Sequence, residues 1–197
     1  MPRRSSRSLW TAKLTGQPVA AAKSEPQLQA QLGMRTSFEG IILGIDPSLR
    51  GTGLAVVAFA PNQSPQLLAS ETVNIPQKVP FDACLGRIHE AVVRQLKAHE
   101  VKCVASEETI SAVNAKVALI LGAARGAAIA AVAAAGLRCL EYKPARIKQA
   151  VTGSGRASKQ QVAAMMAQHL GLKQPLREDE ADAAATACCC AWTWRGD

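Results

Sequence analysis

Residues 40–60 read GIILGIDPSLRGTGLAVVAFA, and this stretch decides the fold. Its opening residues, GIILGID, form a continuous apolar run with the length of a strand at the centre of a sheet. The turn residues Pro47–Gly51 follow, and Thr52–Ala60 predicts a second strand. Because the connection is so short, we expect the two strands to be antiparallel neighbours. The first run ends in Asp46, whose charge is costly to bury unless it is paired or binds a metal.

Outward from this hairpin, strand patterns alternate with helix patterns. A third strand is predicted at Gln66–Ile75, and Pro80 marks the start of a helix. The remaining predicted elements are helix Phe81–Glu100, strand Val101–Glu107, helix Ala112–Ala135, strand Leu137–Tyr142, and helices at Ala145–Val151, Ser158–Leu170 and about Asp179–Trp194. This order predicts an α/β fold with a mixed five-stranded sheet and helices on both of its faces.

Acidic residues stand at the ends of two predicted strands and at the start of the last helix. Asp46 and Glu107 each end a strand, and Asp179 and Asp182 are three residues apart, so both project from one helix face. Taken singly, Asp46 could cap a turn and Asp179 could cap the helix. Converging carboxylates, however, repel one another and take up protons unless a cation is present. Oxygen-only ligands favour Mg²⁺ or Mn²⁺, and two such ions can activate water for phosphodiester hydrolysis.

The net charge of +8 is unevenly distributed. Residues 1–37 hold six Lys/Arg and one acid, which leaves a folded part of only +3. From Tyr142 to Arg177 there are seven Lys/Arg and no acid, and four acids follow directly in Glu178–Asp182. This pattern suits a protein that holds phosphates beside a divalent metal, although charge alone fits two solvated helix faces at least as well. Aromatic residues make up only 4% of the chain, which argues against a single-strand binder of the stacking type.

The cysteines and histidines show no spacing typical of a metal site. We expect the run Cys188–Cys190 to pack as small apolar side chains in a protein from a reducing compartment. The most apolar segment, Val117–Gly136, is interrupted by Arg125, and we interpret it as a buried helix and not as a membrane span. No signal peptide is visible.

Residues 1–37 lack any clear hydrophobic period and are predicted to form a disordered basic extension. The extension could add non-specific DNA affinity, or it could be an organelle transit peptide. Its presence could also reflect a misassigned start, because Met34 stands just before the first strand.

Four segments in order resemble the RuvC-type Holliday junction resolvases, a family of the RNase H-like fold. They are IILGIDPSLRGTGLAVV from Ile41, EETISAVNAKVALILGAARGAA from Glu107, EYKPARIKQAVTGSGRASKQQV from Glu141 and DEADAAATA from Asp179. The resemblance runs in order from about Ile41 to Cys190 and implies a nuclease domain over residues 38–197.

The resemblance implies a metal-dependent endonuclease and assigns its residues. Counting back from the ARG element selects Glu107 as the ligand in preference to Glu108, and strand alternation agrees, because Glu107 shares a face with Cys103 and Ala105. The implied catalytic and metal-binding residues are Asp46, Glu107, Asp179 and Asp182, and the implied DNA-binding residues are Lys148, Lys159, Arg146, Arg156, Asn114 and Ile110.

The resemblance further implies two Mg²⁺ ions per subunit, with Mn²⁺ as a substitute. It implies a homodimer that nicks a four-way DNA junction symmetrically, works with a branch-migration helicase and needs no membrane. We expect a cytoplasmic, nucleoid-associated bacterial protein, with organelle import of a eukaryotic protein as the alternative. Two departures stand out: Ser48 replaces the family's usual Gly, and Ile110 replaces a frequent aromatic residue.

Three other functions compete with this interpretation. A kinase-like ATPase could use Asp46 and Gly51–Gly53 as a phosphate loop, but the chain lacks a second such loop. A non-catalytic junction-binding protein would be expected to lose a ligand, and none of the four is lost. A related nuclease acting on another branched or RNA-containing substrate is the third alternative.

Overall fold

The computed structural model describes residues 36, 38–108 and 114–195. The chain divides after Met34, and every element described below belongs to the second unit, Arg35–Asp197. Apart from Thr36, the predicted basic extension lies outside the described residues, as does Ile110.

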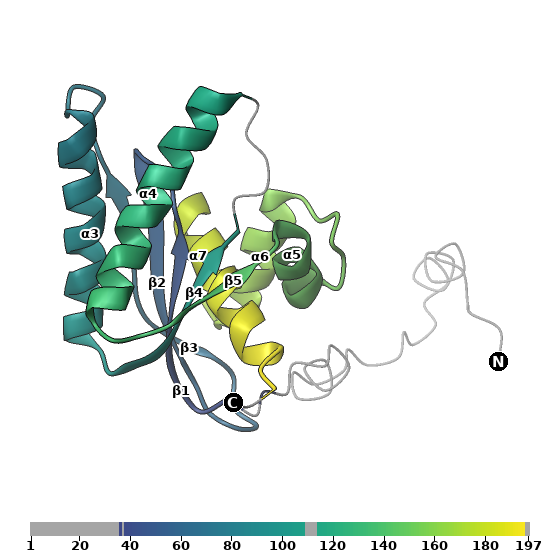
Figure 1. The fold of residues 1–197 in the computed structure, drawn as a ribbon. Coiled ribbons are helices and arrows are strands. Elements are labelled where there is room, and N and C mark those ends of the chain that lie inside the picture. Colours follow the sequence, from purple (N-terminus) through teal and green to yellow (C-terminus); the bar gives the residue numbers. More distant parts are fainter. Residues whose placement is uncertain (1–35, 37, 109–113, 196–197) are drawn as a thin grey trace, which may run out of the picture. The chain divides into compact units, whose positions relative to one another are not determined.

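A mixed five-stranded sheet in the order β3-β2-β1-β4-β5 forms the centre of the fold (Figure 1). Neighbours β1, β2 and β3 are antiparallel, whereas β4 runs parallel to both β1 and β5. The strands are β1 (Gly40–Asp46), β2 (Gly51–Phe59), β3 (Gln66–Asn74), β4 (Val101–Glu107) and β5 (Cys139–Tyr142). The predicted sheet is confirmed, and the predicted bounds of β1 and β4 are those of the structure.

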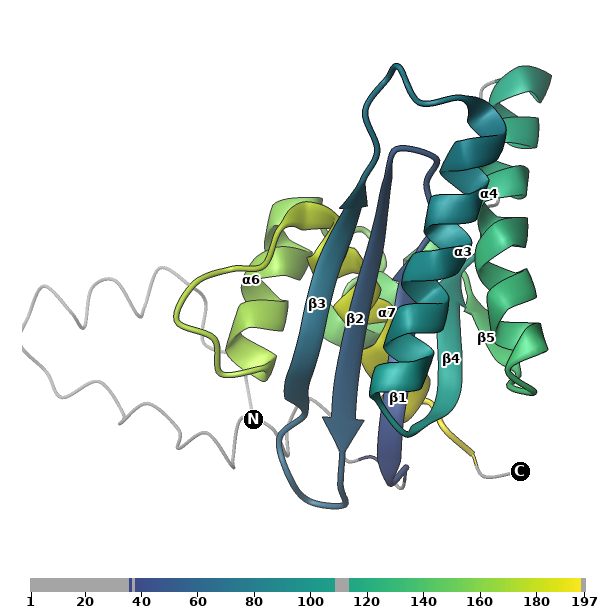
Figure 2. The same cartoon turned by 90° about the vertical axis from the view of Figure 1, so that its left-hand side faces the viewer.

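Helices cover both faces of the sheet, as predicted (Figure 2). One face carries α3 (Phe81–Ala98) and α4 (Ala115–Ala134), and the other carries α5 (Pro144–Thr152), α6 (Lys159–His169) and α7 (Glu178–Trp192). Successive strand residues alternate between these layers: Ile42 packs under α7, and Leu43 packs under α3 and α4. Two hydrophobic cores therefore share one sheet.

The backbone of α7 lies directly on the sheet because two glycines leave room for it. A Cβ atom built on Gly44 would lie 2.0 Å from the carbonyl oxygen of Ala183, and one built on Gly53 would lie 2.0 Å from that of Asp179. Small buried side chains complete the contact, including Cys188–Cys190, which are fully buried. The prediction that these cysteines pack as small apolar groups is confirmed.

The prediction that the Val117–Gly136 segment is a buried helix is wrong. Only Ala124, Ala128, Ala131 and Val132 of α4 are buried, and the side chain of Leu119 is 75% exposed. Among the described helices, α4 alone has the length and apolar composition that would let it cross a membrane, with a mean hydropathy of 2.0. Its apolar residues surround the whole helix, and α3 and the sheet contact only one side.

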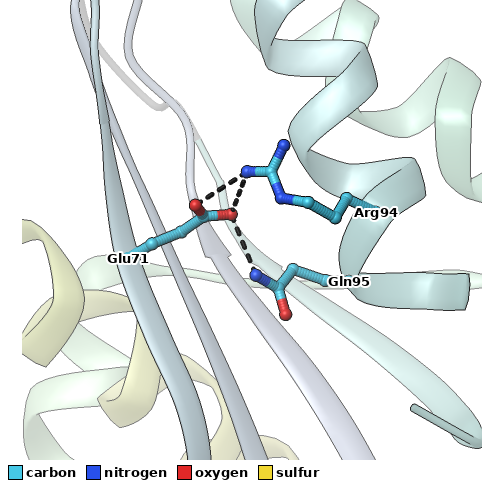
Figure 3. A network of polar contacts seen from close by, with 3 residues as sticks. All are labelled: Glu71, Arg94 and Gln95. Atoms are coloured by element: carbon cyan, nitrogen blue, oxygen red, sulfur yellow. Dashed lines mark hydrogen bonds and ion pairs between the residues drawn. The ribbon is translucent and has the colours of Figure 1, made fainter. Parts of the chain in front are cut away.

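The edge strand β3 is tied to α3 by a polar network (Figure 3). The carboxylate of Glu71 accepts hydrogen bonds from Arg94, at 2.7 and 2.8 Å, and from the side-chain amide of Gln95, at 2.9 Å. An edge strand has only one neighbouring strand, so side-chain contacts of this kind help to fix its position.

Candidate active site

Asp46 is the last residue of β1 and pairs with Gly53 of β2, on which Asp179 in the first turn of α7 packs. The pKa of Asp46 is raised from 3.8 to about 7, first by burial and then by the negative charges of Glu107, Asp182 and Asp179. The nearby ammonium of Lys159 acts in the opposite direction. A carboxylate in such surroundings is poised to bind a cation, because a cation would remove the repulsion.

Glu107 reaches the same place from the neighbouring strand. Because β1 and β4 are parallel, their carboxyl ends meet at one edge of the sheet, with Ile45 opposite Ser106. The predicted face is confirmed, since Cys103 and Ala105 of β4 pack in the core under α7. Burial raises the pKa of Glu107, and Asp182 adds to the effect.

Glu108 has a different role. Its backbone N–H donates to the carbonyl oxygen of Tyr142 at 2.9 Å, which continues the pairing of β4 with β5. Its side chain does not line the cavity that holds Glu107. The structure thus brings the glutamate selected by strand alternation into the site and leaves its neighbour outside.

The first turn of α7 supplies the other two acids. Arg177 is the N-cap residue, so Asp179 lies inside the helix and does not cap it. Its carboxylate lies against the β1–β2 turn, where a Cβ on Gly51 would come within 3.2 Å of its Oδ2 atom. Burial raises the pKa values of both Asp179 and Asp182, despite the positive end of the helix dipole, which favours negative charge there.

The acids meet at a small cavity of about 170 Å³. It is lined by Asp46, Glu107, Pro144, Ile147, Lys148, Lys159, Val162 and Asp182. Asp179 is not among the lining residues, but its charge acts on Asp46. Three of the four predicted acids therefore share one cavity, and the fourth stands beside it.

Both predicted DNA-binding lysines, Lys148 and Lys159, line the same cavity. Lys159 Nζ lies 2.5 Å from Glu178 Oε1 and 3.4 Å from Asp182 Oδ2. The hydrogen bond to Glu178 is the main cause of the raised pKa of Lys159. The positive charge of Lys148 acts on Glu107 and opposes the rise in its pKa.

Of the other predicted DNA-binding residues, the three that the structure describes do not line this cavity. Arg146 on α5 and Arg156 in the loop after it are exposed. Asn114 is the N-cap residue of α4, where its side chain accepts a hydrogen bond from the backbone N–H of Val117 at 3.0 Å. This contact gives Asn114 a structural role that the sequence did not predict.

The donor set fits a hard divalent cation. All four acids offer oxygen, and each has a pKa raised by burial, which a bound cation would counteract. In the described part of the chain, no three acidic, His or Cys side chains already stand in the arrangement of a metal site. The ammonium of Lys159 lies against Asp182, where it supplies positive charge to the cluster.

Several residues shape the site in ways that the sequence did not predict. Ser48 closes the β1–β2 turn: its Oγ accepts from the N–H of Gly51 at 3.0 Å, and its carbonyl accepts from the hydroxyl of Thr52. Thr52 is fully buried, so the loop that suggested an ATPase is packed against the protein itself. Glu180, between the two aspartates of α7, is also buried and hydrogen-bonded. An acid within an otherwise apolar helix face was the available signal.

Comparison with known proteins identifies the family. The family model described as crossover junction endodeoxyribonuclease RuvC matches residues 42–190. RuvC of Halorhodospira halophila is 43% identical over 148 residues, which cover 75% of this chain and 87% of that protein. RuvC of Solidesulfovibrio magneticus is 40% identical over 156 residues, covering 79% of this chain and 92% of that protein.

A solved structure agrees with these matches. The structure of T. thermophilus RuvC in complex with Holliday junction substrate is similar with a TM-score of 0.74 and 35% identity, covering 78% of this chain and 94% of that chain. The expected RNase H-like fold is thereby confirmed. With its matching sequence and its matching fold, this chain belongs to the RuvC family of crossover junction endodeoxyribonucleases.

Proposed function

We propose that this chain resolves Holliday junctions in recombination and repair, using Asp46, Glu107, Asp179 and Asp182 as its catalytic, metal-binding carboxylates. The observation that carries the proposal is that three of these acids line one cavity with Lys148 and Lys159, while the charge of Asp179 acts on Asp46, in a chain of this family. T. thermophilus RuvC, a relative at 35% identity, was solved in complex with Holliday junction substrate.

The chemistry follows from the arrangement of these side chains. When bound, Mg²⁺ (two ions per subunit, with Mn²⁺ as a substitute) would activate water and stabilise the leaving oxygen of a phosphodiester. Asp46 and Glu107 present their carboxyl groups from two neighbouring parallel strands, and α7 adds Asp182 to the cavity and Asp179 beside it. Lys148 and Lys159 stand where the phosphate backbone would approach, and their charges would bind it.

Cleavage of branched DNA with and without Mg²⁺ tests the function directly. We expect symmetric nicking of four-way junctions that requires the ion and stops in a chelator. Three-way junctions and RNA–DNA hybrids are the comparison substrates. If either comparison substrate is cleaved faster than the four-way junction, the chain is a related nuclease with another substrate. If the chain binds the junction in the presence of metal but does not cleave it, the chain is a non-catalytic junction-binding protein.

We also propose that the chain works as a homodimer through α4. Gly122 and Gly126 lie one turn apart on its exposed side, and no atom of the described chain would meet a Cβ placed on either. Their small size is therefore not used for packing on the protomer's own sheet. With Leu119, they offer a second copy an apolar surface on which two helices could approach closely.

A two-fold dimer matches the two-fold symmetry of a four-way junction, so that each subunit can nick one strand. We further propose that Arg146 and Arg156 bind the DNA backbone outside the cavity, that a branch-migration helicase is a partner, and that the protein acts in the bacterial cytoplasm at the nucleoid. Co-purification of the tagged chain with such a helicase from cytoplasmic lysate, with and without nuclease treatment, would test the partner and the location.

A further inference from the structure

Glu180 is a buried carboxylate between the two acids of α7, and the catalytic site does not use it. Its side chain is 9% exposed and points away from the cavity, toward β3. The hydroxyl of Ser70 donates to its Oε2 atom at 2.8 Å, and that of Thr72 donates to its Oε1 atom at 3.3 Å. Both carboxylate oxygens are thus held by one strand.

The first turn of α7 depends on such contacts because it is poorly closed by itself. Its N-cap residue is Arg177, and no side chain of the described residues caps this end through a hydrogen bond. Free N–H groups in a first turn allow the turn to fray, and a capping side chain normally prevents this. Here no described side chain supplies a cap, and the hydrogen bonds of Glu180 together with the close packing of the Asp179 carbonyl on Gly53 hold the turn in place instead.

The strand that holds Glu180 is itself fixed from the opposite face. Ser70 and Thr72 face α7, while Glu71 between them faces α3 and binds Arg94 and Gln95 (Figure 3). Three consecutive residues of the edge strand therefore hold a helix on each face. The contact of Glu71 fixes α3, which carries none of the proposed ligands, whereas the contact of Glu180 fixes α7, which carries two of them.

We propose that Glu180 is a positioning residue, whose hydrogen bonds to Ser70 and Thr72 hold the first turn of α7 so that Asp179 and Asp182 face Asp46. The inference rests on the proposed function, in which these aspartates are metal ligands. Residues of one helical turn move together, so releasing Glu180 displaces both aspartates at once. Groups that orient metal ligands in this way typically account for about 10- to 100-fold in metal affinity.

The test compares E180A with the matched control E71A in the full chain. Each substitution removes a hydrogen-bonded carboxylate that joins β3 to a helix, but only E180A acts on the catalytic helix. The measurements are the dissociation constant of Mn²⁺ by calorimetry without DNA, the Mg²⁺ concentration for half-maximal junction cleavage, and the thermal unfolding midpoint. We expect E180A to weaken Mn²⁺ binding and to raise the Mg²⁺ requirement, each by about 10-fold or more, and E71A to change neither.

A conservative variant separates position from charge. The side-chain amide of E180Q can accept from Ser70 and donate to the oxygen of Thr72, so we expect it to restore Mn²⁺ binding to within about 3-fold of the wild type. Unchanged Mn²⁺ binding in a folded E180A would overturn the proposal. So would equal losses in E180A and E71A, or a loss in E180Q as large as that in E180A.

The variant D182N keeps this test distinct from that of the catalytic site. If D182N also binds Mn²⁺ normally and cleaves junctions, the assignment of the ligands fails, and the positioning role fails with it. If D182N loses both properties and E180A retains them, only the role of Glu180 is refuted. If E180A does not fold, the double variant S70A/T72V removes the same hydrogen bonds from the strand, and Mn²⁺ binding as tight as in the wild type would overturn the proposal.

Discussion

At the scale of single residues, the carboxyl group of Asp46 is the most perturbed acid of the site. Its neighbours Glu107, Asp179 and Asp182 are all acids, and burial withholds the water that would screen them. A folded chain without metal therefore carries an electrostatic cost at this point, which a bound cation removes. The two resulting predictions concern catalysis and stability.

The substitution D46N is expected to abolish cleavage while junction binding stays within a few-fold of the wild type. It removes one ligand from the site, but binding depends mainly on contacts with phosphates elsewhere. Nicking and electrophoretic binding assays on the same four-way junction would measure the two effects. Cleavage by D46N at the wild-type rate would remove Asp46 from the catalytic site.

The metal-free protein should lose stability as the pH rises toward 8. The pKa of Asp46 is 3.8 in the unfolded chain and about 7 in the folded chain, so the folded state binds the extra proton between these values. Its stability therefore falls as the pH rises through this window, by an amount on the order of a few kcal/mol when Asp46 is fully ionised.

Thermal unfolding in a chelator between pH 6 and pH 8 would measure this slope. Burial lowers the pKa of His169, which removes stability as the pH falls below about 6.5, so the slope is best taken as the difference between wild type and D46N. We expect D46N to be the more stable protein at pH 8 and Mg²⁺ to narrow the gap. A difference that does not change with pH would contradict the prediction.

The two adjacent glutamates provide the third residue-scale prediction. E107Q should reduce nicking by roughly 100-fold or more, because losing a charged ligand removes several kcal/mol of transition-state stabilisation. E108Q should retain most of the activity, since the structure uses the backbone of Glu108 to pair with Tyr142. Single-turnover cleavage rates would compare the pair, and the opposite ranking would mean that the register of β4 is wrong.

At the scale of elements, the contact of α7 with the sheet tolerates the least change in side-chain size, because Gly44 and Gly53 lie directly beneath the helix backbone. The substitution G53A places a Cβ 2.0 Å from the carbonyl oxygen of Asp179, so the helix has to move. We expect a loss of about 1–3 kcal/mol in unfolding free energy, together with lower cleavage activity. The change would be read from chemical denaturation and from nicking rates.

Gly86 in α3 is the matched control, because a Cβ there would meet no atom of the described chain within 4 Å. G86A should leave cleavage unchanged and raise stability by about 0.5–1 kcal/mol, the usual gain of alanine over glycine inside a helix. If G53A is as stable and active as G86A, α7 does not rest on β2 as described.

Much of the fold and of the site could be predicted from the sequence, because both depend on local patterns. The apolar run before Asp46 and the alternation before Glu107 determine which strands are central and which face each acid takes. The exposure of α4 could not be predicted in this way. The helix α4 is apolar on all sides, including the side that carries the exposed Leu119. Its hydrophobic pattern would be the same whether its own chain or a second copy covered it.

The hydrogen bonds of Glu180 could not be predicted either, because its partners Ser70 and Thr72 precede it in the chain by 110 and 108 positions. No local period connects an edge strand with the first turn of a helix so distant from it. Spacing within α7 places Asp179 and Asp182 on one face and Glu180 off it, but it could not show which part of the chain Glu180 contacts. Identifying these partners requires the three-dimensional structure, in which β3 packs beside the first turn of α7.

At the scale of the whole molecule, the exposed side of α4 predicts the oligomeric state. We expect light scattering at micromolar concentration to give twice the chain mass of 20.7 kDa. L119E places a charge on the proposed interface and should shift the protein to monomers, because a buried unpaired charge is costly. The control L68E changes a side chain on β3 that is 39% exposed and should remain dimeric. A wild-type monomer, also in the presence of junction DNA, would contradict the proposal.

The position of α7 near the end of the chain affects when, during synthesis, the protein can begin to cleave DNA. The ribosome makes the strands with Asp46 and Glu107 first, and the helix Glu178–Trp192 only after all five strands. A polypeptide that stops before α7 therefore holds only two of the four proposed metal ligands and lacks the helix whose backbone lies directly on the sheet. On the proposed assignment of the ligands, we expect nicking only from chains whose synthesis has passed Asp182, so that an unfinished chain would leave the genome intact.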